Sequence, residues 1–124
     1  MTQRLIKAIE NPHVDIIAHP TGRLLLEREG IDADWEKVYL AAKKHNKILE
    51  INAYPNRLDL PDNLVREAKK FGIKFSISTD SHHLEHLRLM EYGVSVARRG
   101  WITKEDVVNT LQWNEFSKIF NLKD

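Results

Sequence analysis

The chain has 124 residues, of which 42% are hydrophobic, and nineteen Lys and Arg side chains nearly balance eighteen Asp and Glu. This composition supports a folded core, and it excludes a disordered chain, a strongly basic nucleic-acid arm and a polybasic membrane anchor. Cysteine is absent, which excludes a disulfide scaffold, a thiolate nucleophile and a cysteine-ligated zinc. Because the sequence shows neither a membrane-spanning apolar run nor a signal-peptide core after Met1, we expect a cytoplasmic protein without membrane contact.

Three short apolar runs rich in β-branched residues predict strands over residues 14–18, 48–53 and 74–79. Continuous runs of this kind are typical of strands buried on both faces of a parallel sheet. Helical spacing of apolar residues predicts helices between and after them. The expected helices begin at Asp32 or Asp34, at Asp59 or Asp62, near Leu84, after Thr103 and near Trp113. The first closes at Asn46 and the second at Gly72. Gly93 weakens or ends the third, and two alternatives stay open for residues 94–97, a continued helix or an extended segment.

This alternation of strands and helices predicts an α/β fold made of parallel βα units. Right-handed crossovers then place the helices outside the sheet. A three-stranded sheet has two open edges, which are a liability unless another segment covers them.

Polar or ionisable side chains follow each predicted strand. His19 follows the first strand, Asn52 lies in the second, and Asp80 and His82 follow the third. Ligands bind at the carboxyl ends of parallel strands, so these residues are expected at one rim. Asp80 and His82 are two residues apart and would point the same way in an extended segment, as ligands of one divalent metal do. The alternative is that Asp80 caps the next helix and His82 is exposed at its start.

Three further charged residues accompany the strand ends. Glu50 lies among apolar neighbours, and if it is buried it needs either a salt bridge to Arg or Lys or a bound metal. The planar guanidinium groups of Arg23 and Arg57 could hold a phosphate. They could equally pair with Asp59 or Glu27.

Four segments carry a more specific signal than these single residues. They are HPTGRLL at 19–25, EINAYPNRLDL at 50–60, TDSH at 79–82 and ARRGWI at 97–102. In this order they closely resemble the PHP (polymerase and histidinol phosphatase) domain at the C-terminus of bacterial and archaeal family X DNA polymerases. The resemblance implies that residues 1–124 are the C-terminal portion of such a domain, without its N-terminal portion and the polymerase domain.

The resemblance also implies a fold and a site. PHP domains form a distorted (βα)7 barrel that holds up to three divalent metals, Mn²⁺ or Zn²⁺ and possibly Mg²⁺, through nine His, Asp and Glu ligands. Matched motif by motif, the resemblance implies that His19, Asp80 and His82 are the metal ligands and catalytic residues of this chain. Arg23 and Arg57 are candidates for binding phosphate. The opening His-x-His motif and the middle ligands of the family have no counterpart here.

The function implied by the resemblance is a metal-dependent phosphoesterase and 3′–5′ exonuclease domain that serves a family X polymerase in DNA repair, with DNA as substrate. From the ligand count we expect the chain alone to bind at most one metal weakly and to lack useful catalysis. Open sheet edges predict association with itself or with the remainder of the PHP domain. Two alternatives stay open: a small-molecule phosphatase similar to histidinol phosphatase, and a non-catalytic interaction module.

Overall fold

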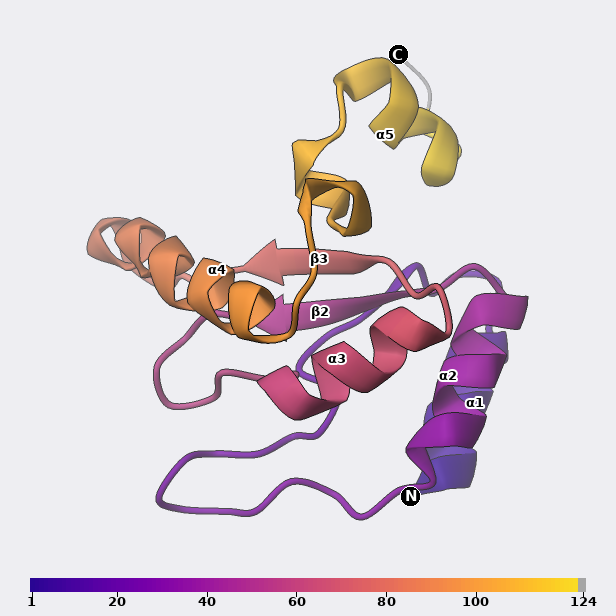
Figure 1. Ribbon diagram of the computed structural model, residues 1–124, viewed down its shortest axis with the longest axis horizontal. Coiled ribbons are helices and arrows are strands. Elements are labelled where there is room, and N and C mark those ends of the chain that lie inside the picture. Colours follow the sequence, from indigo (N-terminus) through magenta and orange to yellow (C-terminus); the bar gives the residue numbers. More distant parts are fainter. Residues whose placement is uncertain (123–124) are drawn as a thin grey trace.

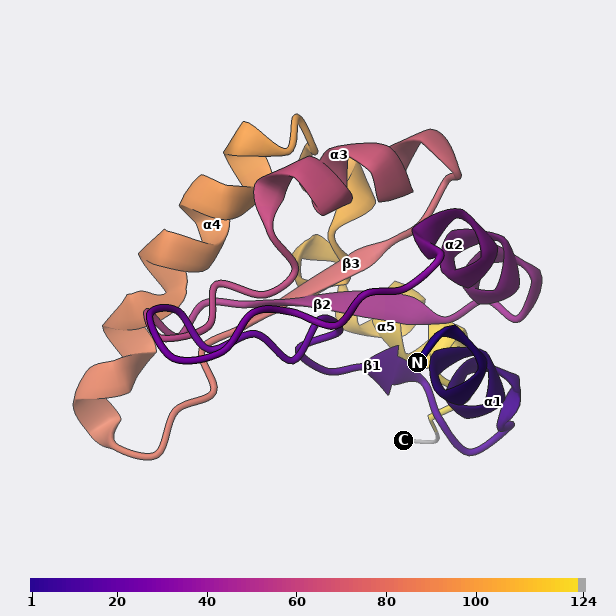
Figure 2. The same ribbon diagram turned by 90° about the horizontal axis from the view of Figure 1, so that it is seen from below.

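The computed structural model describes residues 1–122, and its centre is a sheet of three parallel strands in the order β1-β2-β3 (Figures 1 and 2). The strands are β1 (Ile16–Ile17), β2 (Ile48–Asn52) and β3 (Phe75–Ser78). The predicted parallel α/β arrangement is confirmed, although each strand is shorter than the apolar run that predicts it. The described residues form an open sheet, and the (βα)7 barrel stays a prediction.

Within residues 1–122, five α-helices and three 3₁₀ helices surround the strands, and α3 and α5 lie on opposite sides of the sheet (Figures 1 and 2). The α-helices are α1 (Thr2–Glu10), α2 (Trp35–Lys44), α3 (Asp62–Lys70), α4 (Met90–Arg99) and α5 (Trp113–Ile119). The 3₁₀ helices are η1 (Leu84–Leu89), η2 (Lys104–Asp106) and η3 (Val108–Thr110). The sequence analysis missed α1, which has no side-chain cap at its start and packs beside α2. Within the described part of the chain, no helix is long and apolar enough to cross a membrane.

Two helix starts were predicted with alternatives, and the structure decides between them. Asp34 caps α2 because its carboxylate accepts the backbone N–H of Lys37. Asp59 does not cap α3, which begins at Asp62 after Pro61 without a side-chain cap. The carboxylate of Asp59 is instead fully buried and bonded elsewhere.

Gly93 does not end the third helix, and residues 94–97 continue as helix. The chain winds as η1 from Leu84 and continues as α4 through Gly93 to Arg99. A Cβ atom at Gly93 would lie 2.5 Å from Cγ2 of Ile77 and 2.8 Å from Cβ of Ala53. The glycine therefore lets the helix approach the sheet closely, and this contact outweighs the low helix propensity of glycine.

The two faces of the sheet differ in polarity. Leu49 and Ile51 of β2, with Phe75 and Ile77 of β3, belong to the buried core that the helices cover. Because side chains alternate along a strand, the opposite face carries the polar side chains. They are Glu50, Asn52, Ser76 and Ser78, and in the parallel register Glu50 lies beside Ser76 and Asn52 beside Ser78. The candidate site lies at the carboxyl ends of the strands, next to the polar face.

Only one of the two expected open edges is unpaired in the described part of the chain. Val107 forms a parallel bridge with Phe75 along the outer edge of β3. β1 pairs with β2 on one side, and none of residues 1–122 pairs with its other side. The self-association predicted from open edges therefore has one edge to use, and it stays a prediction.

Candidate functional site

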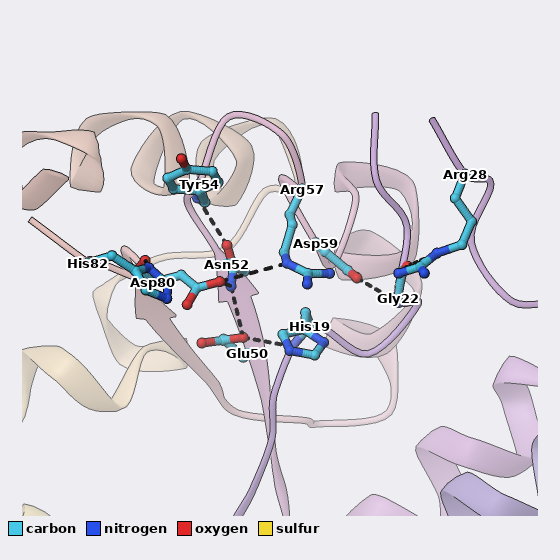
Figure 3. A network of polar contacts seen from close by, with 10 residues as sticks. All are labelled: His19, Gly22, Arg28, Glu50, Asn52, Tyr54, Arg57, Asp59, Asp80 and His82. Atoms are coloured by element: carbon cyan, nitrogen blue, oxygen red, sulfur yellow. Dashed lines mark hydrogen bonds and ion pairs between the residues drawn. The ribbon is translucent and has the colours of Figure 1, made fainter. Parts of the chain in front are cut away.

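Asn52, the last residue of β2, lies at the centre of a polar network that joins the ends of all three strands (Figure 3). It is buried, and its Nδ2 atom donates to Oδ2 of Asp80 at 3.1 Å and lies 3.5 Å from Oε2 of Glu50. Its Oδ1 atom accepts the backbone N–H of Tyr54 at 3.0 Å. The convergence of polar residues at the strand ends, predicted from the sequence, is thus present.

Glu50 is buried without a basic partner among residues 1–122, so one of its two alternatives, a salt bridge to Arg or Lys, is absent there. Only 8% of the residue is exposed. Its Oε2 atom accepts the backbone N–H of His19 at 2.6 Å, across the gap between β2 and the end of β1. A charged acceptor strengthens such a hydrogen bond, and Glu50 therefore fixes where the His19 segment leaves the sheet.

Asp80 does not cap the helix that follows it. The cap position of η1 is His83, and no side chain caps that helix. The Asp80 carboxylate instead faces β2, where its Oδ2 atom bonds Asn52 and lies 3.7 Å from Nε of Arg57. Its backbone is left-handed, with φ of 54°, so the chain turns sharply at this strand end.

His82 is held by the backbone of the residue two positions before it. Its Nδ1 atom lies 2.8 Å from the carbonyl oxygen of Asp80. A carbonyl oxygen only accepts, so Nδ1 is the donor, and in the neutral ring this tautomer has its lone pair on Nε2. His82 is exposed, as the alternative reading expected, but it presents the nitrogen that a metal ligand needs.

Asp59, which the sequence analysis considered only as a cap or an ion-pair partner, holds the loop that carries His19. It is fully buried, and its two carboxylate oxygens accept the backbone N–H groups of Thr21 at 3.0 Å and Gly22 at 2.8 Å. Neither Arg23 nor Arg57 forms an ion pair with it, so that alternative is wrong. Nothing in the sequence indicates that Asp59 binds these backbone N–H groups, because an aspartate shortly before a helix is also common as a helix cap.

The two candidate phosphate-binding arginines have different surroundings. Arg23 donates from Nε to the carbonyl of Arg57 at 2.9 Å and from Nη2 to the carbonyl of Leu58, so its guanidinium fastens two loops together. Arg57 approaches Asp80 through Nε, while its Nη1 atom is buried without a hydrogen-bond partner in the described residues. Arg57 is therefore the better placed of the two to meet an added anion.

Three rings that the sequence analysis did not assign to the site, those of Tyr54, His83 and His86, lie next to it. Nδ1 of His86 accepts the backbone N–H of His82 at 3.2 Å. The ring of Tyr54 meets the His86 ring edge-on, with centroids 5.4 Å apart, and His83 stacks on His86 at 5.3 Å. These contacts join the loops after β2 and β3.

The three predicted metal ligands are not gathered around one point. In the part of the chain that the structure describes, no three His, Asp or Glu side chains could hold a metal ion together. His82 lies on the far side of Asp80 from His19 (Figure 3). Each of the three still has an atom that could bind a metal and that forms no hydrogen bond with another described residue. These atoms are Nε2 of His82, Oδ1 of Asp80 and the ring nitrogens of His19. Imidazole and carboxylate groups suit Mn²⁺ or Zn²⁺, so they fit part of a coordination shell that needs further ligands.

A pocket of about 420 Å³ lies away from this network. It is lined by residues around the start of β2 and β3, among them Lys47, Ile48 and Lys74, with Ile119 of α5. In parallel α/β folds the chemistry occurs at the other end of the strands, and we assign no function to this pocket.

Most of this chain is similar to one part of a bacterial DNA polymerase. It is 45% identical over 107 residues, or 86% of the chain, to the DNA polymerase/3'-5' exonuclease PolX of Bacillus subtilis. The chain spans 19% of that polymerase. The relationship to family X DNA polymerases that the four motifs predict is therefore confirmed.

Other relatives are named as probable phosphatases. The chain is 33% identical over 115 residues to one from Thermoanaerobacter sp. (strain X514), and 24% identical over 116 residues to one from Vibrio parahaemolyticus. Each alignment covers 88% of the chain and 44% of the phosphatase. The chain thus spans less than half the length of these relatives. No family model matches it.

Proposed function

We propose that this chain, a relative of the PolX polymerase and of the probable phosphatases, supplies one side of a metal-dependent phosphoesterase site. The arrangement of Asp80 and His82 carries the proposal. The Asp80 carbonyl lies 2.8 Å from Nδ1 of His82 and selects the neutral tautomer whose lone pair is on Nε2, while Oδ1 of Asp80 forms no hydrogen bond with another described residue. With His19 at the end of β1, these donors form the part of a metal shell that this chain contributes.

Each residue of the site has a distinct role in the proposed reaction. A divalent ion such as Mn²⁺, Zn²⁺ or Mg²⁺ supplies Lewis acidity toward water and phosphate oxygens when it is bound. Together with further ligands, Asp80 would contribute a negative oxygen to such an ion, and His19 and His82 would contribute imidazole nitrogens. Arg57 has a buried Nη1 donor that finds no partner among residues 1–122, and we assign this donor to a phosphate oxygen of the substrate. Arg23, whose Nε and Nη2 bond backbone carbonyls, shapes the loop that carries His19.

We assign a DNA phosphodiester as the substrate of the full-length protein, in which this site would work beside a polymerase domain. Support comes from the 45% identity to a protein named as a 3'-5' exonuclease. Because no three His, Asp or Glu side chains among the described residues could hold a metal ion together, we expect no useful hydrolysis from the chain alone. Robust manganese- or zinc-dependent nuclease activity of the purified chain, abolished by Asp80→Ala, would contradict that expectation.

Titration of the chain with Mn²⁺ and Zn²⁺ by calorimetry tests the metal site. We expect weak binding of one ion, and we expect Asp80→Ala and His82→Ala to reduce its affinity. His13→Ala is the matched control, since His13 is exposed in a turn before β1. Absence of binding at millimolar metal would refute the metal site in this chain and favour a non-catalytic interaction module.

The relatives named as probable phosphatases favour a second candidate function, hydrolysis of a small phosphomonoester. Both functions use the same residues and differ in the substrate. After the chain is combined with a polypeptide that supplies the missing ligands, turnover of a single-stranded oligonucleotide is compared with that of p-nitrophenyl phosphate. Faster turnover of the oligonucleotide supports the nuclease function, and the reverse supports the phosphatase.

A further inference from the structure

We infer that Asn52 and Glu50 are positioning residues that set the distance between the His19 segment and the Asp80 carboxylate. Both are more than nine-tenths buried on the polar face of β2. They are absent from the ligand set that the motifs predict. The inference rests on the proposed function, because positioning is useful only if His19 and Asp80 bind a common cofactor or substrate.

The orientation of the Asn52 amide is determined by its three partners. The Tyr54 backbone N–H can only donate, so it requires the amide oxygen on its side. Two carboxylates, from Glu50 and Asp80, lie on the other side and require the amide N–H groups. A reversed amide would place its oxygen against both carboxylates and leave Tyr54 without an acceptor. Asn52 is therefore locked in one orientation by groups on either side.

Asn52 joins two carboxylates that have different tasks. Asp80 retains a free Oδ1 and has Arg57 within 3.7 Å, so it can serve as a ligand. Glu50 has no basic partner among residues 1–122, and its Oε2 is shared between the Asn52 amide and the His19 backbone N–H. A series of contacts runs from Asp80 through Asn52 and Glu50 to His19 and connects the ends of the three strands (Figure 3). Predicted metal ligands lie at its two ends, and the two residues between them are not predicted ligands.

Groups that support metal ligands in this way typically change metal affinity by about 10- to 100-fold when they are mutated. Asn52→Leu removes both amide donors while keeping a similar side-chain volume, and Glu50→Leu removes the acceptor of the His19 N–H. Glu50→Gln keeps an oxygen acceptor for that N–H. We therefore expect large losses of Mn²⁺ affinity for the two leucine variants and a smaller loss for the glutamine variant.

The first measurement needs no metal. In ¹H–¹⁵N spectra of the apo chain, the His19 amide proton should resonate downfield, because it donates to a carboxylate at 2.6 Å. Glu50→Leu should shift it upfield, Asn52→Leu should shift it less, and Glu50→Gln should largely restore it. The dispersion of the remaining amide signals shows whether each variant is folded. An unchanged His19 amide in folded Glu50→Leu would overturn the inference.

The second measurement is a double-mutant cycle of Mn²⁺ affinity between Asn52→Leu and Asp80→Ala. If Asn52 acts through Asp80, the double variant binds Mn²⁺ no more weakly than Asp80→Ala alone. Additive losses would mean a general structural effect and would overturn the inference. If the wild-type chain does not bind Mn²⁺ at all, the proposed function fails, while the His19 amide still decides whether the positioning pair exists.

Discussion

The side-chain amide of Asn109 pairs with the backbone of Ile77 as the edge of another strand would. The Ile77 N–H donates to Oδ1 of Asn109 at 2.8 Å, and Nδ2 of Asn109 donates to the Ile77 carbonyl at 2.9 Å. Together with the Val107 bridge to Phe75, this pair satisfies the outer edge of β3. Unpaired edges invite intermolecular strand pairing, so Asn109 protects the side of the sheet opposite β1.

Asn109→Ala should expose this edge. We expect the free energy of unfolding to fall by about 2 kcal/mol, because both backbone groups of Ile77 lose their partners. The variant should also self-associate more readily, which sedimentation velocity at increasing concentration would detect. Asn114→Ala, at an exposed position in α5, is the control. Equal sedimentation of the two variants would show that Asn109 does not protect the edge.

Asp59→Ala should destabilise the loop that carries His19. The substitution leaves the backbone N–H groups of Thr21 and Gly22 without their acceptors inside the protein. We expect a loss of roughly 3 kcal/mol in urea unfolding, because each buried donor loses a charged partner. Asp15→Ala, at an exposed position before β1, should change stability by less than about 0.5 kcal/mol. A loss no larger than that of the control would contradict this role of Asp59.

Gly93→Ala should lower stability although alanine favours helices. The added methyl group would lie 2.5 Å from Cγ2 of Ile77 and 2.8 Å from Cβ of Ala53. Overpacking of this kind costs about 1–3 kcal/mol, which exceeds the gain of about 1 kcal/mol in helix propensity. Thermal unfolding of this variant is compared with that of Val94→Ala, a change on the exposed side of the same helix. A higher melting temperature for Gly93→Ala would show that α4 can move away from the sheet.

Asp106→Asn should make stability less dependent on pH in the acid range. Burial disfavours the charged form of Asp106, but the Thr103 backbone N–H and Lys69 outweigh it and hold the pKa of the carboxyl below its ordinary 3.8. A lowered pKa in the folded state means that the carboxylate stabilises the fold above pH 3.8, and that this contribution is lost as the pH falls through the folded-state pKa.

The variant should therefore be less stable than wild type by about 1 kcal/mol at pH 7 and nearly equal to it at the acid end. Urea unfolding at several pH values measures the difference. Asp32→Asn is the control, because Asp32 is exposed and forms no hydrogen bond or ion pair with another described residue. A difference between Asp106→Asn and wild type that does not change with pH would contradict the assignment.

Much of the fold could be predicted because its signals are local. The Asp34 cap and the closing Asn46, which has φ of 54°, follow from side-chain chemistry within a few residues. The three strands follow from runs of β-branched residues. The sequence leaves the continuation of the helix through Gly93 open, because the low helix propensity of glycine is a local signal, whereas its close contact with Ile77 joins segments distant in the sequence.

The sequence by itself determined the parallel βα order, the polar character of the strand ends, and the choice of His19, Asp80 and His82 as candidate ligands. Only the tertiary structure decided which polar residues support them. Asn52, Glu50 and Asp59 are common residue types with several ordinary uses, and their roles depend on burial and on backbone N–H groups up to 38 positions away. The alignment of the three strands determines these partners. A buried carboxylate or amide is stable only with a hydrogen-bond partner, and the fold determines which backbone groups lie within reach.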